Sequence, residues 1–430
     1  MTPTLASPQN LPDHVANACA DDRADLSLDT RPDTRSLMTL GPRPHQVFTH
    51  GQGSWLWDHQ GRRYLDLVQG WAVNTLGHAP PALARALTAQ AGRLLQAGPG
   101  LYNEPAAQLA RRLAGLSGLD RVFIGTSGSE ANEAAVKLVR KYGQVHRGGA
   151  STVLSFEHSF HGRSLAMMAA SGKPGFDAVY APPVQGFRKL PFNDIDAVAV
   201  AITPDVVAVL VEPVQGEAGV VEAAPGFLPA LRALCKQHGL LLILDEVQTG
   251  IGRCGSLFAH TQWGIRPDIM TLGKGLGGGV PISAMLAREA VCCFAPGDQG
   301  GTYHGHALMS AAALAVLDAV TAPGFLGQVQ ARGVQLRAGL QALSDRHRLD
   351  GVQGRGLLQA LRLPAGWQAG AVADAAREPA RGDGLLVNPA QPQRLRLMPA
   401  LTLTEAELAL ALQGLDGALH AARPGAAIRA

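Results

Sequence analysis

Short aliphatic runs that alternate with stretches of helical periodicity limit the fold of this chain more than any other feature. The runs occupy residues 206–211, 240–244, 268–272 and 283–287. Between the first two, Pro225 precedes and Gly239 follows a helix-like stretch, as is typical of helix ends. Buried strands that are connected by helices form a largely parallel sheet with both faces covered. The sequence therefore predicts an α/β fold.

The two ends of the chain have a different pattern. Residues 51–80 read as strands and turns, and beyond about residue 323 helices accompany a short strand at 394–397. Thr404 and Glu407 form a capping box before the last of these helices. Because 430 residues exceed the usual size of a single core, we expect more than one domain. The expected parts are a mobile tail (1–35), a large domain (86–325), and a smaller, discontinuous α+β domain (36–85 and 326–430).

Composition argues against several classes of protein. With 37 basic and 34 acidic side chains and no basic stripe, nothing indicates nucleic-acid binding. No apolar run approaches membrane-spanning length, and the first 35 residues lack the hydrophobic stretch of a secretory signal. The five cysteines lack the paired spacing of a zinc site, which favours reduced thiols in a cytoplasmic protein. His304 and His306 have no acidic companion, so we expect no metal.

Three segments follow predicted strands, where ligands of a parallel sheet bind. The first, 125–130 (GTSGSE), precedes a helix. Small residues at a helix N-terminus favour an anion such as phosphate, although an ordinary capped turn has the same pattern. The second begins with Asp245, directly after the run 240–244. A carboxylate there needs a cationic partner, which could be a ligand or an arginine.

The third segment places Lys274 in the glycine-rich turn 272–279. The GxxxxGK[ST] order of a nucleotide-binding loop is absent because Gly275 follows the lysine. A desolvated amine has a lowered pKa and becomes nucleophilic, so a Schiff-base lysine fits better. An amine, a carboxylate and a phosphate cradle are together what pyridoxal 5'-phosphate (PLP) requires. The conjunction predicts this cofactor, with Lys274 and Asp245 as catalytic residues.

From about residue 37 to residue 420 the sequence resembles the class III aminotransferases of the ornithine and acetylornithine type. The motifs that carry the likeness are GSWLWD (53–58), YLD (64–66), NTLGH (74–78), LYNEP (101–105), SGSEAN (127–132), SFHGR (159–163), EPVQGE (212–217), DEVQTG (245–250) and GKG (273–275). The resemblance implies a fold type I aminotransferase, with a mostly parallel central sheet in the large domain. It also implies a homodimer with shared active sites.

The resemblance assigns cofactor contacts to matching residues. Lys274 would bind PLP as a Schiff base, and Asp245 would pair with the pyridine nitrogen. Gln248 would touch the phenolic oxygen, and Phe160 would lie on the ring face. Gly128 and Ser129 would donate to the phosphate, which Thr302 of the partner subunit would also reach. The remaining expected cofactor contacts are Ser127, Glu246 and Val247.

The implied reaction moves the ω-amino group of N2-acetylornithine, or of a similar acylated ω-amine, to 2-oxoglutarate, giving a semialdehyde and glutamate. Arg163 and Arg396 would hold substrate carboxylates, with Glu217 beside Arg396. Succinylornithine, ornithine and 4-aminobutyrate are alternative donors. A non-catalytic, cofactor-binding dimer is the alternative of a different class. Its support is the run 304–307 (HGHA), where the family usually has Gly-Asn-Pro.

Overall fold

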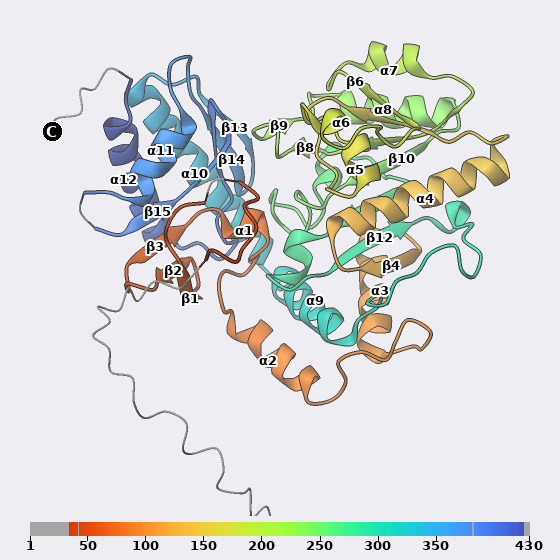
Figure 1. Cartoon of the computed structure of the whole chain (residues 1–430), viewed down its shortest axis with the longest axis horizontal. Helices are drawn as coiled ribbons and strands as arrows, with labels where there is room; N and C mark the ends of the chain where they lie inside the picture. Colours follow the sequence, from red (N-terminus) through yellow and green to blue (C-terminus); the bar gives the residue numbers. More distant parts are fainter. Residues whose placement is uncertain (1–33, 42, 381, 425–430) are drawn as a thin grey trace, which may run out of the picture.

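The computed structural model describes residues 34–424 except 42 and 381. The predicted tail therefore falls almost entirely outside the described residues. A seven-stranded sheet, with the order β4-β12-β11-β10-β7-β5-β6, forms the centre of the larger part of the molecule (Figure 1). Its strands are β4 (Arg121–Gly125), β5 (Thr152–Phe156), β6 (Phe187–Leu190), β7 (Val206–Val211), β10 (Leu241–Asp245), β11 (Ile269–Leu272) and β12 (Ser283–Ala287).

The sheet is mostly parallel, as predicted. Strands β11, β10, β7, β5 and β6 run parallel to one another, whereas β12 is antiparallel to both β11 and β4. In β10, Leu241 and Ile243 pack with α4 (Gly128–His146), while Leu242 and Leu244 pack with α8 (Phe227–Gln237) on the opposite face. Helices on both faces explain why every residue of β10 is buried.

Strands from the two ends of the chain share a second sheet. β1 (Phe48–Gln52), β2 (Trp55–Asp58) and β3 (Arg63–Asp66) are joined by β15 (Gly384–Leu386), which pairs in parallel with β3. A third, antiparallel sheet has the order β13-β14-β17-β16. Its strands are β13 (Val352–Arg355), β14 (Leu358–Arg362), β16 (Asn388–Gln391) and β17 (Arg394–Leu397).

One hydrophobic core joins the first strands to the last helices. Leu65 and Leu67 pack with residues of α10 (Phe325–His347), α11 (Ala369–Arg377) and α12 (Glu405–Ala421), and Figure 1 shows β3 next to β15. The smaller α+β part is therefore discontinuous, while the boundaries 36–85, 86–325 and 326–430 stay predictions. The capping box of Thr404 and Glu407 is present at the start of α12.

The other elements connect these layers. They are α1 (Gln69–Ala72), α2 (Pro81–Ala91), α3 (Glu104–Ser117), α5 (Leu165–Ala170), α6 (Phe176–Val179), α7 (Ile195–Ala201), β8 (Val214–Gln215), β9 (Val221–Glu222) and α9 (Ala307–Val320). Short 3-10 turns cover Ala259–Trp263, Lys274–Gly277 and Glu289–Val291. In the described part of the chain no single helix has the length and apolarity to cross a membrane; α9 and α10 meet that test only as a pair bent by 72°.

Candidate active site

A cavity of about 260 Å³ lies beyond the carboxyl ends of the central strands. It brings together eight residues predicted from the sequence: Gly128, Ser129, Phe160, Arg163, Asp245, Val247, Gln248 and Lys274. Four further residues complete its wall: Asn132, His161, Gly162 and Glu212. Among the described residues, no group of three or more His, Cys, Asp or Glu side chains is arranged to hold a metal ion.

Asp245, the last residue of β10, is held by two side chains and one backbone N–H group. Its Oδ2 accepts a hydrogen bond from Asn132 Nδ2 of α4 (2.8 Å) and lies 2.7 Å from His161 Nδ1. Its Oδ1 accepts from the backbone of Val247 at 3.0 Å. Thr271 fixes Asn132 in turn, through a 2.7 Å bond from its hydroxyl to Oδ1. The carboxylate is buried but fully hydrogen-bonded, so its position in the cavity wall is set before any ligand binds.

Lys274 follows β11 in a left-handed backbone conformation, with φ at 37°. Thr75 stabilises this turn by donating from its hydroxyl to the carbonyl of Gly275 (2.7 Å). Burial lowers the pKa of the Lys274 ammonium; the Glu217 carboxylate opposes this shift and the Arg396 guanidinium adds to it. More of the amine is therefore unprotonated near neutral pH, which is the nucleophilic form.

The start of α4 and the segment after β10 touch so closely that only glycine fits at residue 128. A Cβ atom on Gly128 would lie 2.6 Å from Val247 Cγ1. On the other side of the loop, Ser129 Oγ accepts from the backbone of Ser164 at 3.3 Å. Backbone N–H groups at the helix N-terminus therefore face the cavity edge without a side chain in front of them, which suits an anion.

Arg396 is a completely buried cation that contacts Gln248 of the cavity wall, although neither Arg396 nor Glu217 lines the cavity itself. Its Nη2 donates to Glu217 Oε1 (2.8 Å), its Nη1 to the carbonyl of Gly216 (2.8 Å), and its Nε to Asn388 Oδ1 (3.0 Å). Burial alone would raise the pKa of Glu217, but the charges of Arg396 and Lys274 and the hydrogen bond from Arg396 together lower it. Glu217 is therefore ionised and neutralises the arginine in this structure.

Gln248 and Phe160 have one side each that is open to the cavity. Gln248 Oε1 accepts from Arg396 at 3.3 Å, while its Nε2 is buried without a partner among the described residues. The backbone of Phe160 donates to Glu212 Oε1 (2.9 Å), and its ring lies 5.9 Å from the guanidinium carbon of Arg163.

Glu212 was not assigned a role from the sequence, although it stands in the EPVQGE motif. Burial raises its pKa to about 7; the nearby His161 opposes this shift and the Asp245 charge adds to it. Asn132 was missed as well. It lies one helical turn after Gly128 and Ser129 and therefore faces the same side of α4, a spacing that could have revealed it.

Three predicted cofactor residues lie outside the cavity wall. The hydroxyl of Ser127 caps α4 by accepting from Glu130 N (3.3 Å). The carboxylate of Glu246 points the other way and accepts from the backbone N–H groups of Ala259 (2.6 Å) and His260 (2.8 Å). Thr302 is exposed in a loop, where its carbonyl accepts from Gln96 Nε2 at 2.9 Å. Their contacts with a cofactor stay predictions.

The residues present fit PLP. The partnerless Gln248 Nε2 offers a hydrogen-bond donor to an oxygen, Lys274 offers an amine to an aldehyde, and the glycine at position 128 leaves room for a phosphate. Asp245 offers a carboxylate to a protonated ring nitrogen. When bound, PLP supplies an aldehyde for an amino group and a ring that takes up electrons from the carbon beside it.

Residues 40–419 match the family described as aminotransferase class III. The chain belongs to the class III aminotransferases. Acetylornithine aminotransferase 2 of Bordetella bronchiseptica is 54% identical over 388 residues, which cover 90% of this chain and 98% of that protein. Among solved structures, N-acetylornithine aminotransferase from Stenotrophomonas maltophilia matches with a TM-score of 0.77 at 38% identity, covering 88% of this chain and 96% of that one.

A PLP-bound amine transaminase from an uncultivated Pseudomonas species matches with a TM-score of 0.84 at 30% identity, covering 91% of this chain and all of that one. As a class III aminotransferase, this chain has the fold type I architecture and is a PLP-dependent transaminase. Its substrates are an amino donor and a keto acid.

Proposed function

We propose that this aminotransferase transfers the ω-amino group of N2-acetylornithine, or of a closely similar acylated ω-amine, to 2-oxoglutarate. The products are a semialdehyde and glutamate. The observation that carries the proposal is the ion pair between the buried Arg396 and the partly buried Glu217, at 2.8 Å. A relative named acetylornithine aminotransferase 2, at 54% identity, supports the same donor.

The ion pair lets one cavity accept two different amino partners. Glutamate reacts at its α-amine, so its α-carboxylate must lie beside the reacting carbon, where Arg396 can hold it. An ω-amine has no carboxylate at that position, and an unpaired buried arginine would be costly. Glu217 neutralises Arg396 in that half of the reaction.

Arg163 suits the distant carboxylate of the ω-amine. It is exposed at the cavity mouth, and its guanidinium carbon lies 5.9 Å and 5.7 Å from the ring centres of Phe160 and Phe176. The aromatic rings offer apolar surface to an acyl group next to that carboxylate. Arg163 and Arg396 thus define the two ends of the substrate site.

Two side chains act on two different protons. Asp245, fixed by Asn132 and His161, keeps a ring nitrogen protonated and so favours uptake of negative charge by the ring. Lys274 Nζ, whose pKa is lowered by burial, holds the proton that leaves the substrate carbon and returns it at the next position.

We also propose a cytoplasmic homodimer in which Thr302 reaches the phosphate site of the partner subunit. Segment 95–103 and loop 301–308 lie against each other, with Asn103 Nδ2 donating to Gly305 O at 2.7 Å. Four large apolar side chains are exposed there: Leu95 (52%), Leu101 (67%), Tyr102 (103%) and Tyr303 (60%). Apolar surface of this kind is typical of a protein interface.

A comparison of half-reactions tests the donor. The purified, PLP-loaded protein is mixed separately with N2-acetylornithine, succinylornithine, ornithine and 4-aminobutyrate, and cofactor absorbance is followed. We expect N2-acetylornithine to bleach it with the highest kcat/KM, and Lys274→Ala to show no turnover. A higher kcat/KM for an unacylated amine would overturn the acylated donor, and no bleaching by any amine would favour a non-catalytic dimer.

A further inference from the structure

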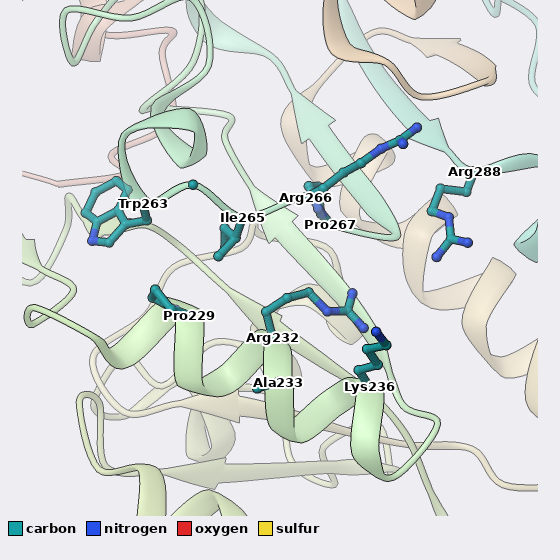
Figure 2. A pocket seen from close by; sticks show the side chains of 10 residues that line it. Pro229, Arg232, Ala233, Lys236, Trp263, Ile265, Arg266, Pro267 and Arg288 are labelled. Atoms are coloured by element: carbon teal, nitrogen blue, oxygen red, sulfur yellow. The ribbon is translucent and has the colours of Figure 1, made fainter.

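A second cavity, of about 560 Å³, lies between helix α8 and the loop that leads into β11 (Figure 2). Asp268 precedes β11 beside this cavity, whereas Lys274 follows the opposite end of the same strand. The ends of β11 are roughly 10 Å apart at about 3.3 Å per residue, and Asp268 and Lys274 lie beyond them. The α8 groove, as we call this cavity, is therefore separate from the active site.

One end of the α8 groove is strongly cationic. Arg232, Lys236, Arg266 and Arg288 line it, and its described lining contains no acidic residue. The nearest carboxylate, Asp268, is buried and already bound on both oxygens: Arg232 Nη1 and Arg288 Nη1 each donate to it at 2.6 Å. Asp268 thus compensates two of the four cations, and Arg266 donates to the carbonyl of Gly118, which leaves excess positive charge at the surface.

Lys236 is the cation of this group that has the fewest hydrogen bonds and ion pairs within the described residues. It is exposed at the end of α8, and no hydrogen bond or ion pair of its ammonium occurs within the described residues. Arg232 and Lys236 are four residues apart on α8 and so lie on the same helix face, and Figure 2 shows both side chains at the same end of the groove. Arg232 and Arg288 share Asp268, so this carboxylate does not balance the charge of Lys236, which favours a bound anion.

The other end of the groove is apolar. Pro229 and Ala233 lie on α8, and Trp263, Ile265 and Pro267 lie on the facing loop. Pro229, Ala233 and Lys236 follow the spacing of one helix face, so the apolar and cationic ends are adjacent on one surface. From residue 229 to residue 236 the helix rises roughly 10 Å at about 1.5 Å per residue.

We propose that the α8 groove binds an organic phosphate: a ligand with a multiply charged phosphate head and a planar or apolar body. The head lies among Lys236, Arg232 and Arg288, and the body lies along Pro229, Ala233 and Ile265 toward Trp263. Guanidinium and ammonium groups together are the donors that bind phosphate best. The apolar end sets this groove apart from a site for inorganic phosphate.

The test is calorimetric titration of the PLP-loaded enzyme, in which the cofactor already occupies the active site. The probes are ADP for head and body, inorganic pyrophosphate for the head, and adenosine for the body. We expect ADP to bind about tenfold more tightly than pyrophosphate, and its affinity to fall with added salt. Adenosine should bind too weakly to detect.

Two variants at exposed positions locate the site. Lys236→Met should weaken ADP binding about tenfold by removing one charge-assisted contact, and Ala233→Phe should abolish it by filling the apolar end. Arg111→Met, which removes an exposed cation from helix α3, should bind ADP like the unmodified enzyme. All three should keep their transaminase rates.

Several results would overturn the proposal. Undetectable ADP binding would do so, as would ADP affinity that is unchanged in both Lys236→Met and Ala233→Phe. If pyrophosphate bound as tightly as ADP, the apolar body would not contribute to binding. If adenosine bound as tightly as ADP, the phosphate head would not contribute.

Discussion

At the scale of single residues, Asp245 carries the clearest consequence. Asn132 and His161 direct two donors at its Oδ2, and the Val247 N–H donates to its Oδ1. The NH2 group of Asp245→Asn would therefore face a donor in either orientation. A neutral amide also cannot hold a protonated ring nitrogen. We expect turnover to fall about a hundredfold, on the order of 3 kcal/mol, with PLP still bound. Steady-state kinetics and the PLP absorbance check this, with exposed Asp196→Asn as the control. Near-normal turnover would show that Asp245 only caps the end of β10 and has no catalytic role.

Glu217 and Arg396 make opposite predictions for the two half-reactions. Glu217→Ala leaves Arg396 without its carboxylate partner. The single-turnover rate with glutamate should hold or rise, while the rate with N2-acetylornithine should fall by roughly tenfold, about 1.4 kcal/mol. Glu217→Gln keeps the shape of the side chain and removes its charge, so it shows which of the two determines the rates. Equal slowing of both half-reactions would make Glu217 a structural residue.

Protonation of Glu212 is expected to make the free energy of unfolding depend on pH. Because burial raises its pKa to about 7, the folded protein holds this proton more tightly than the unfolded chain does. The protonated Glu212 contributes fully to the free energy of unfolding below the ordinary pKa of glutamate. This contribution, up to about 3 kcal/mol, is lost as pH rises through about 7. Glu212→Gln can still accept the hydrogen bond from Phe160 N, so it should reduce the fall in stability between pH 5 and 8. Urea unfolding at both pH values measures this, and an unchanged pH dependence would contradict it.

At the scale of elements, the contact of helix α4 with the segment after β10 positions the anion cradle. Gly128→Ala would place a methyl group 2.6 Å from Val247 Cγ1 and force the two apart. We expect a loss of about 1–3 kcal/mol in stability and weaker PLP binding. Adding Val247→Ala should restore much of both, which titration with PLP and thermal unfolding would reveal. Gly115→Ala in α3, where nothing lies within 4 Å, is the control. Additive losses in the double variant would show that the contact is not responsible.

Elements with a strong hydrophobic pattern were predictable from the sequence. The predicted strand 206–211 is β7 itself, and 240–244 differs from β10 by one residue at each end, because continuous aliphatic runs leave a buried strand as the stable choice. The parallel pairing of β15 with β3 joins residues more than 300 positions apart. No local pattern encodes such a pairing.

The site was predictable to the extent that its residues end strands or begin helices. Lys274, Asp245 and Gly128 meet because β11, β10 and β4 point the same way, so their carboxyl ends share one edge of the sheet. The direction of a side chain is not encoded in this way. Asp245 and Glu246 are adjacent, yet the first faces the cavity and the second holds the turn at Ala259. Only tertiary contacts decide which of two consecutive carboxylates reaches the ligand.

At the scale of the whole molecule, the loop at Thr302 predicts that active sites are shared. Lys274→Ala and Thr302→Val are each expected to be inactive. When the two variants exchange subunits, each mixed dimer has one site with both defects and one with neither. Up to about half of the dimers then contain one intact site, so activity should return on mixing, with light scattering to verify dimers and labelled subunits to verify exchange. If exchange occurs and activity stays absent, the sites are not shared.

The position of Thr75 has a consequence for the newly made protein. Thr75 bonds the turn at Lys274, and its carbonyl in turn accepts from the backbone of Leu401. The reactive lysine is thus braced by a residue near the start of the chain, which is itself braced by one near the end. A chain still under synthesis has its lysine long before it has that support. The brace on the Lys274 turn is therefore complete only after residue 401 has been synthesised.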